Sequence, residues 1–221
     1  MTKQRVSIKE KILNVPFENW AREELFLGSY TISIDTRDYE YLLIYSRPVK
    51  EWRQPLPLRL HSACMTSEIC GGSRRCDCKW QLDFALSYIQ KVNNGLVIYA
   101  PSEAGRGQGI TKKLKSFMIM DARHIGSKEA FEELGIDPDP RTYVAQAKIL
   151  NDLKVKKAIL ITNNPEKVDA VRKVGIDIVE RLPVVQDDDP QIRAYLEMKA
   201  RDFGHILTGD TKSKKGKAQK R

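Results

Sequence analysis

The chain has few of the features that define membrane, secreted or disordered proteins. It is 221 residues long, with 41% apolar residues, four Cys, three His and three Trp. No apolar run approaches the ~20 residues of a membrane-spanning helix. Lys3, Arg5 and Lys9 place charge where a secretory signal peptide is apolar. Too much of the chain is apolar for wholesale disorder. We therefore expect a cytoplasmic protein with one sizeable core and no membrane partner.

Acidic residues are missing from the end of the chain. The segment 211–221 contains five Lys, one Arg and no Asp or Glu, and it supplies most of the formal net charge of +9. A solvated tail explains such a run more simply than a nucleic-acid-binding arm does. We expect residues 1–210 to form a single domain and residues 211–221 to form a basic, disordered tail. A nucleic-acid partner is not expected.

All four cysteines lie between positions 64 and 78. A secreted disulfide scaffold would spread its cysteines through the chain, so this crowding indicates metal or redox chemistry in a reducing compartment. Cys64, Cys76 and Cys78 have the spacing for one Zn²⁺, and three protein ligands leave the fourth position to water, as in catalytic zinc sites. If Cys70 also binds, the site is closed and structural, but its Ile-Cys-Gly-Gly setting favours a free thiol in a turn. Thiols without metal are the other alternative. His61 is a ligand, a substrate contact or a structural residue.

Strands and helices alternate along most of the chain. Residues 30–34 alternate polar and apolar side chains, and residues 96–100 and 158–162 are short apolar runs typical of buried strands. Asn164 and Pro165 have the residue types of a helix cap and a first helical residue. The alternation from about 58 to 182 predicts an α/β fold. The expected strands are 30–34, 41–45, 58–62, 96–100, 158–162 and 176–181, and the expected helices are 80–92, 114–120, 144–153, 165–174 and 190–204.

Six segments resemble the GTP cyclohydrolase II family, which opens riboflavin biosynthesis. Residues 59–68 read R-L-H-S-A-C-M-T-S-E and residues 75–82 read R-C-D-C-K-W-Q-L, close to the family's zinc-binding patterns R-V-H-S-E-C-L-T-G-D and L-R-C-D-C-G-x-Q-L. Further matches are G-R-G-x-G at 105–109, D-P-R-x-Y at 139–143, L-I-T-N-N-P-E-K at 160–167 and V-E-R-L-P at 179–183. These blocks keep the family's order over about residues 58–204, and the first fifty residues match loosely.

The resemblance implies a homodimeric α/β hydrolase with three layers around a mixed central sheet. Zinc on Cys64, Cys76 and Cys78 would activate water to open the imidazole ring of GTP at C8, and magnesium would accompany the phosphates, with release of formate and pyrophosphate. Asp139 and Arg141 match the family's proposed general base and proposed Arg nucleophile. A guanidinium is a poor nucleophile, so stabilisation of the departing pyrophosphate is the easier role to defend. The implied substrate-binding residues are Arg59, His61, Ser62, Gln81, Glu103, Gly105, Arg106, Phe117, Ser127, Thr162 and Lys167.

Three polar groups of the family pattern are missing here. Ala63 and Ala104 stand where the family has carboxylates, although Glu103 lies next to the second position, and Phe117 stands where the family has a catalytic Tyr. That Tyr is thought to assist hydrolysis at the opened ring. Two end points therefore stay open: the family's release of formate, or, because Phe117 lacks the hydroxyl, a formamidopyrimidine nucleotide that keeps the formyl group. The alternatives are ring opening of another nucleotide, such as a pyrimidine nucleotide, and a non-catalytic zinc-containing protein that binds nucleotides or nucleic acid.

Overall fold

The first three strands form an antiparallel meander. The structure is a computed structural model that describes residues 4–19, 21–73, 75–186 and 189–208. In it β1 (Val6–Glu18) pairs with β2 (Glu24–Ile34), and β2 pairs with β3 (Arg37–Tyr45). The predicted strands at 30–34 and 41–45 lie within β2 and β3. The sequence did not predict β1, because this mostly exposed edge strand has little polar–apolar alternation.

The remaining four strands are parallel to one another. They are β4 (Leu56–Ser62), β5 (Leu96–Ala100), β6 (Lys157–Ile161) and β7 (Asp177–Leu182). Because β5 also pairs antiparallel with β3, all seven strands form one mixed sheet in the order β1-β2-β3-β5-β4-β6-β7. This arrangement confirms the predicted α/β class with a mixed central sheet.

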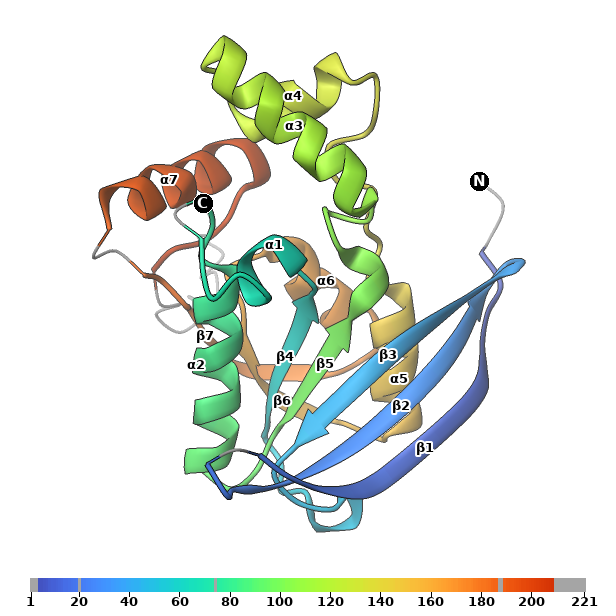
Figure 1. The fold of residues 1–221 in the computed structure, drawn as a ribbon. Helices are drawn as coiled ribbons and strands as arrows, with labels where there is room; N and C mark the ends of the chain where they lie inside the picture. Colours follow the sequence, from blue (N-terminus) through green and yellow to red (C-terminus); the bar gives the residue numbers. More distant parts are fainter. Residues whose placement is uncertain (1–3, 20, 74, 187–188, 209–221) are drawn as a thin grey trace, which may run out of the picture.

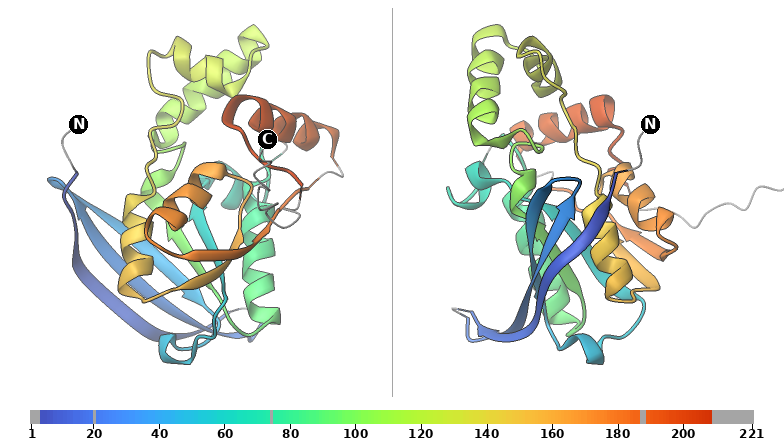
Figure 2. Two further views of the ribbon diagram at one scale, coloured as in Figure 1. Left: turned by 180° about the vertical axis from the view of Figure 1, so that it is seen from behind. Right: turned by 90° about the vertical axis from the view of Figure 1, so that its right-hand side faces the viewer.

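Helices cover both faces of the sheet and complete three layers. Helix α2 (Cys78–Lys91) lies on one face, and α5 (Val144–Asp152) and α6 (Pro165–Lys173) lie on the other (Figures 1 and 2). Ile149 and Leu150 of α5 are fully buried against the sheet, and Ile89 of α2 is fully buried on the opposite face. Burial of each such side chain contributes about 1.5–3 kcal/mol. The predicted cap is confirmed at α6, where Asn164 accepts a hydrogen bond from the N–H of Glu166.

A cap of helices lies over the carboxyl ends of β4 and β5 (Figure 1). Helix α3 (Gly109–Arg123) extends the predicted helix at 114–120 in both directions, and α7 (Pro190–Phe203) matches the predicted one. The sequence analysis did not predict α4 (Ser127–Glu133), nor the short segments α1 (Met65–Glu68), η1 (Val49–Glu51) and η2 (Pro101–Glu103). Ligands bind at the carboxyl ends of parallel strands, so a ligand-binding site is expected between this cap and the sheet.

The described residues extend almost to the end of the predicted domain. The predicted tail at 211–221 lies outside them, so the division at residue 210 stays a prediction. Within the described part of the chain, no helix combines the length and apolarity needed to cross a membrane.

Candidate active site

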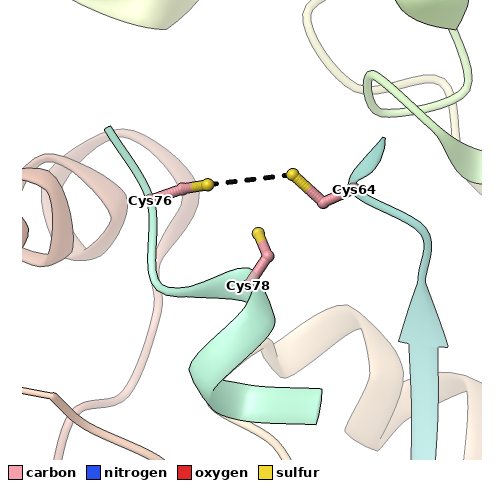
Figure 3. A group of neighbouring side chains, drawn as sticks. All are labelled: Cys64, Cys76 and Cys78. Carbon is pink, nitrogen blue, oxygen red and sulfur yellow. Dashed lines mark hydrogen bonds between the residues drawn. The ribbon is translucent and has the colours of Figure 1, made fainter. Parts of the chain in front are cut away.

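Three cysteines meet above the carboxyl end of β4. Cys64 follows this strand and precedes α1, Cys76 lies in the next loop, and Cys78 is the first residue of α2 (Figure 3). Their three sulfur atoms lie within 4.8 Å of one another, and Cys64 and Cys76 are buried. Cys70 is exposed and lies outside this cluster. Gly72, in the loop between the ligand segments, has φ of +133°, a conformation that suits glycine.

The sulfur positions fit a tetrahedral metal ion. Zn–S bonds of about 2.3 Å place two sulfurs of a tetrahedron roughly 3.8 Å apart. The Sγ atoms of Cys64 and Cys76 are 3.7 Å apart. Hydrogen bonds from Cys76 and Cys78, followed by the Lys113 ammonium, lower the pKa of Cys64, whereas the Cys64 sulfur raises the pKa of both partners. Three thiolates this close repel one another, and a divalent cation removes that conflict.

Glu68 fixes the position of the first cysteine. Its Oε1 accepts hydrogen bonds from the backbone N–H of Cys64 at 2.8 Å and from Nε2 of His61 at 2.8 Å. Its Oε2 accepts one from the hydroxyl of Tyr99 at 2.6 Å. Burial raises the pKa of Glu68, but these hydrogen bonds lower it below its usual value overall. Glu68 is therefore an ionised carboxylate that orients the loop of Cys64, and it was not among the site residues predicted from the sequence.

His61 and Arg59 form a buried layer beneath the cleft. Nε of Arg59 donates to Nδ1 of His61 at 3.0 Å, and burial lowers the pKa of His61 to about 4, so His61 is neutral at pH 7. Nη2 of Arg59 donates to Oε1 of Gln81 at 2.6 Å, and Nε2 of Gln81 donates to Asp77 at 2.5 Å. The polar atoms of these predicted substrate-binding residues are already engaged inside the protein. They hold one another in place, and direct substrate contact stays a prediction for each.

Ser62 stands at the centre of a second polar network. Its hydroxyl donates to Glu103, and it accepts from Nη1 of Arg141 at 3.0 Å and from Nζ of Lys167 at 3.4 Å. Arg141 also forms a two-pronged ion pair with Asp139. Burial raises the pKa of Asp139, but the Arg141 guanidinium lowers it overall, so Asp139 is ionised. Arg141 stays protonated because its ion pair with Asp139 outweighs burial and raises its pKa.

The Gly-rich loop between β5 and α3 is a tight turn. Gly105 has φ of +62°, and a Cβ there would lie 2.4 Å from the carbonyl oxygen of Gly109, so only glycine fits. A Gly-rich loop between a strand and a helix can present backbone N–H groups to phosphates. Instead the N–H groups of Gly107, Gln108 and Gly109 bond within the loop. Arg106 remains available for a ligand, because its buried Nη1 has no partner in the structure.

Two adjoining cavities contain the predicted site residues. One, of about 550 Å³ including its mouth, is lined by Arg59, His61, Ser62, Gln81, Arg141, Thr162 and Lys167. The other, of about 620 Å³, is lined by the three cysteines with Ser62, Glu103, Gly105, Arg106, Phe117, Ser127 and Arg141. The two cavities share Ser62, Arg141, Tyr195 and Lys199, so they are neighbouring parts of one cleft. Asp139 is not among the described residues that line either cavity, but it pairs with Arg141, which lines both. A wider surface hollow lined by Glu23, Arg47 and Gln90 lies at the far end of the sheet, away from the thiols.

Three further residues of α3 and α7 line these cavities and were not among the predicted site residues: Lys113, Tyr195 and Lys199. Nζ of Lys113 lies 2.9 Å from Sγ of Cys64 and 5.7 Å from the ring centre of Phe117. Tyr195 and Lys199 of α7 line both cavities. A signal for the two residues of α7 is their spacing, because Tyr195 and Lys199 are four residues apart and so lie on the same side of the helix.

The fold and the thiol cluster define a class of protein: an α/β protein with three cysteines, placed to hold one metal ion, at the carboxyl end of a parallel strand in a mixed sheet. The model of the GTP cyclohydrolase II family matches residues 24–183, and the chain belongs to that family.

Named relatives agree with this assignment. The chain is 39% identical over 159 residues to "Riboflavin biosynthesis protein RibBA" of Aquifex aeolicus, and this alignment covers 71% of the chain and 39% of the relative. It is 40% identical over 153 residues to "GTP cyclohydrolase-2" of Buchnera aphidicola, covering 69% of this chain and 76% of the relative. It is 39% identical over 153 residues to "Monofunctional riboflavin biosynthesis protein RIBA 3, chloroplastic" of Arabidopsis thaliana, covering 69% and 30%. The match thus spans well under half of the Aquifex and Arabidopsis proteins.

Proposed function

We propose that this chain is a zinc-dependent hydrolase that opens the imidazole ring of GTP at C8. The observation that carries the proposal is the three-thiol cluster, which lines a cavity together with several Arg and Lys side chains. The family of the chain and the name of the Buchnera relative support GTP as the substrate. The names of the Aquifex and Arabidopsis relatives support riboflavin biosynthesis as the pathway.

Cys64, Cys76 and Cys78 would hold the zinc ion. When bound, zinc supplies Lewis-acid chemistry that makes water a nucleophile near neutral pH. Glu68 would keep the cluster rigid by holding the N–H of Cys64. Lys113, 2.9 Å from Cys64, would place positive charge next to the reacting carbon, where negative charge develops when water adds.

Basic residues of the cleft would bind the phosphates, and magnesium would offset part of the phosphate charge. Lys167 and Arg141 both reach Ser62, and Arg106 approaches the neighbouring cavity. The ion pair with Asp139 keeps Arg141 protonated and oriented. Arg141 would therefore stabilise the departing pyrophosphate electrostatically and would not act as a nucleophile on the phosphate of the nucleotide.

Phe117 would set the end point of the reaction. Its ring lines the cavity of the thiols, with the Arg75 guanidinium 5.0 Å from the ring centre. A Tyr hydroxyl at this position could exchange protons with the opened ring, and Phe cannot. We propose that the formyl group stays on more of the product than in a Phe117→Tyr variant.

The test is product analysis by mass spectrometry. Zinc- and magnesium-loaded protein is incubated with GTP and, separately, with GMP, ATP and UTP. Ring-opened product from GTP supports the proposal, and formyl retention that Phe117→Tyr reverses assigns the end point to Phe117. Turnover of another nucleotide but not GTP would reassign the substrate, and the first residue to examine is Ala63, which lines the cavity in place of a carboxylate. No turnover of any of them would favour a binding protein.

The proposal extends to assembly and location. The family resemblance supports a homodimer, which light scattering of the purified protein tests. A cytoplasmic location fits four free thiols, because such thiols persist in reducing compartments.

A further inference from the structure

Helix α7 places a buried lysine in the wall between the two cavities. Lys199 is 9% exposed and lines both cavities, together with Tyr195 of the same helix. Its Nζ lies 5.6 Å from the ring centre of Tyr195 and 5.4 Å from that of Phe203. Within the part of the chain that the structure describes, Lys199 Nζ has no hydrogen bond and no ion pair. A buried ammonium without an acceptor is costly, and an anion would relieve that cost.

The surroundings of Lys199 have an excess of positive charge. Seven basic side chains line the two cavities: Arg59, Arg75, Arg106, Lys113, Arg141, Lys167 and Lys199. The carboxylates that line them in the described residues are Asp77 and Glu103, and both already accept hydrogen bonds from neutral side chains. Asp139 is occupied by Arg141. The lining of the cleft therefore has more cationic than anionic side chains, which is the charge pattern of a site for a multiply charged anion.

Helix α7 is anchored in the orientation that directs Lys199 into the cleft. The Arg106 guanidinium lies 4.3 Å from the ring centre of Phe203, so this ring lies against the side chains of both Arg106 and Lys199. The segment after the helix is fixed by a 2.9 Å hydrogen bond from the N–H of Ile206 to the carbonyl of Asn163. Because the helix is held before a ligand arrives, binding need not order it.

We propose that Lys199 binds a phosphate oxygen of the nucleotide and that α7 forms a wall of the phosphate site. This inference rests on the proposed function for the identity of the nucleotide, but its chemistry requires only a polyphosphate. It assigns Lys199 and α7 to the phosphate site in addition to Lys167, Arg141 and Arg106.

The test is direct binding of inorganic triphosphate by isothermal titration calorimetry, with guanosine as the uncharged comparison. We expect Lys199→Met to weaken triphosphate binding by roughly ten- to hundredfold, the range of a charge-assisted hydrogen bond. Guanosine affinity should be unchanged, and Lys199→Arg should recover most of the triphosphate affinity. The matched control is Arg201→Met on the same helix, because Arg201 is 68% exposed and pairs with Asp202.

Thermal unfolding separates a binding role from a structural one. Lys199→Met removes a buried unpaired charge and should raise the Tm of the ligand-free protein. Unchanged triphosphate affinity in Lys199→Met, or an equal loss in Arg201→Met, would overturn the proposal. Because binding is measured without turnover, the result holds whether or not the protein opens the ring of GTP.

Discussion

Replacing Glu68 by Gln tests how the thiol cluster is held. The change keeps the shape of the side chain and leaves one oxygen to accept from His61 and from the N–H of Cys64, each at 2.8 Å in the wild type. The new amide NH₂ would face the Tyr99 hydroxyl, which now donates to Oε2 at 2.6 Å. One hydrogen bond to a charged group is lost, which costs about 1.5–3 kcal/mol.

That loss should appear in both stability and metal affinity. For a chain of this size it lowers Tm by roughly 3–12 °C, and loss of a group that orients a ligand weakens metal binding by roughly 10- to 100-fold. The assays are calorimetry and competition with a chromophoric zinc chelator. Tyr99→Phe removes the same hydrogen bond from the other side, so the double variant should cost less than the sum of the two single changes. If Glu68→Gln kept wild-type Tm and zinc affinity, the positioning role would be refuted.

Two other predictions concern the metal site and pH. Cys76→Ser should lose stoichiometric zinc, whereas Cys70→Ser, at an exposed site outside the cluster, should retain it; elemental analysis checks both, and equal loss in the two variants would indicate a four-cysteine site. Burial lowers the pKa of Lys167 and of Lys199 to about 7 from an ordinary 10.5. The unfolded chain then binds more protons than the folded one between those values, so these lysines make Tm rise with pH above about 7. Lys199→Met should have a shallower rise, and an unchanged slope would contradict the shift.

The elements that the sequence predicted well have local signals. Helix α6 begins with its own capping residue and a proline, and β5 is an apolar run bounded by polar turns, so nearby residues determine both. Strand β1 has no such signal, because its pairing with β2 defines it as a strand. The three metal-site cysteines were predicted from spacing, and they do converge.

The residues that sequence reasoning missed act over long distances in the chain. Lys113 reaches Cys64 from 49 residues away, and Lys199 reaches the cleft because α7 packs back over the sheet. Glu68 lies within the family-like segment 59–68, but only the fold brings His61, Tyr99 and the N–H of Cys64 to its carboxylate. Spacing predicts which residues can ligate a metal, and tertiary packing decides which residues orient them.

Hydrolysis of GTP in water enriched in heavy oxygen tests the central claim most directly. Zinc-loaded wild type and Cys76→Ser are incubated side by side, and the products are analysed by mass spectrometry. If water adds at C8, the wild type should place one heavy oxygen in a retained formyl group, or two in released formate because a second water cleaves the formamide, and Cys76→Ser should produce neither. Ring opening without heavy oxygen in that one-carbon fragment, or equal turnover by Cys76→Ser, would contradict zinc-dependent hydrolysis at this site.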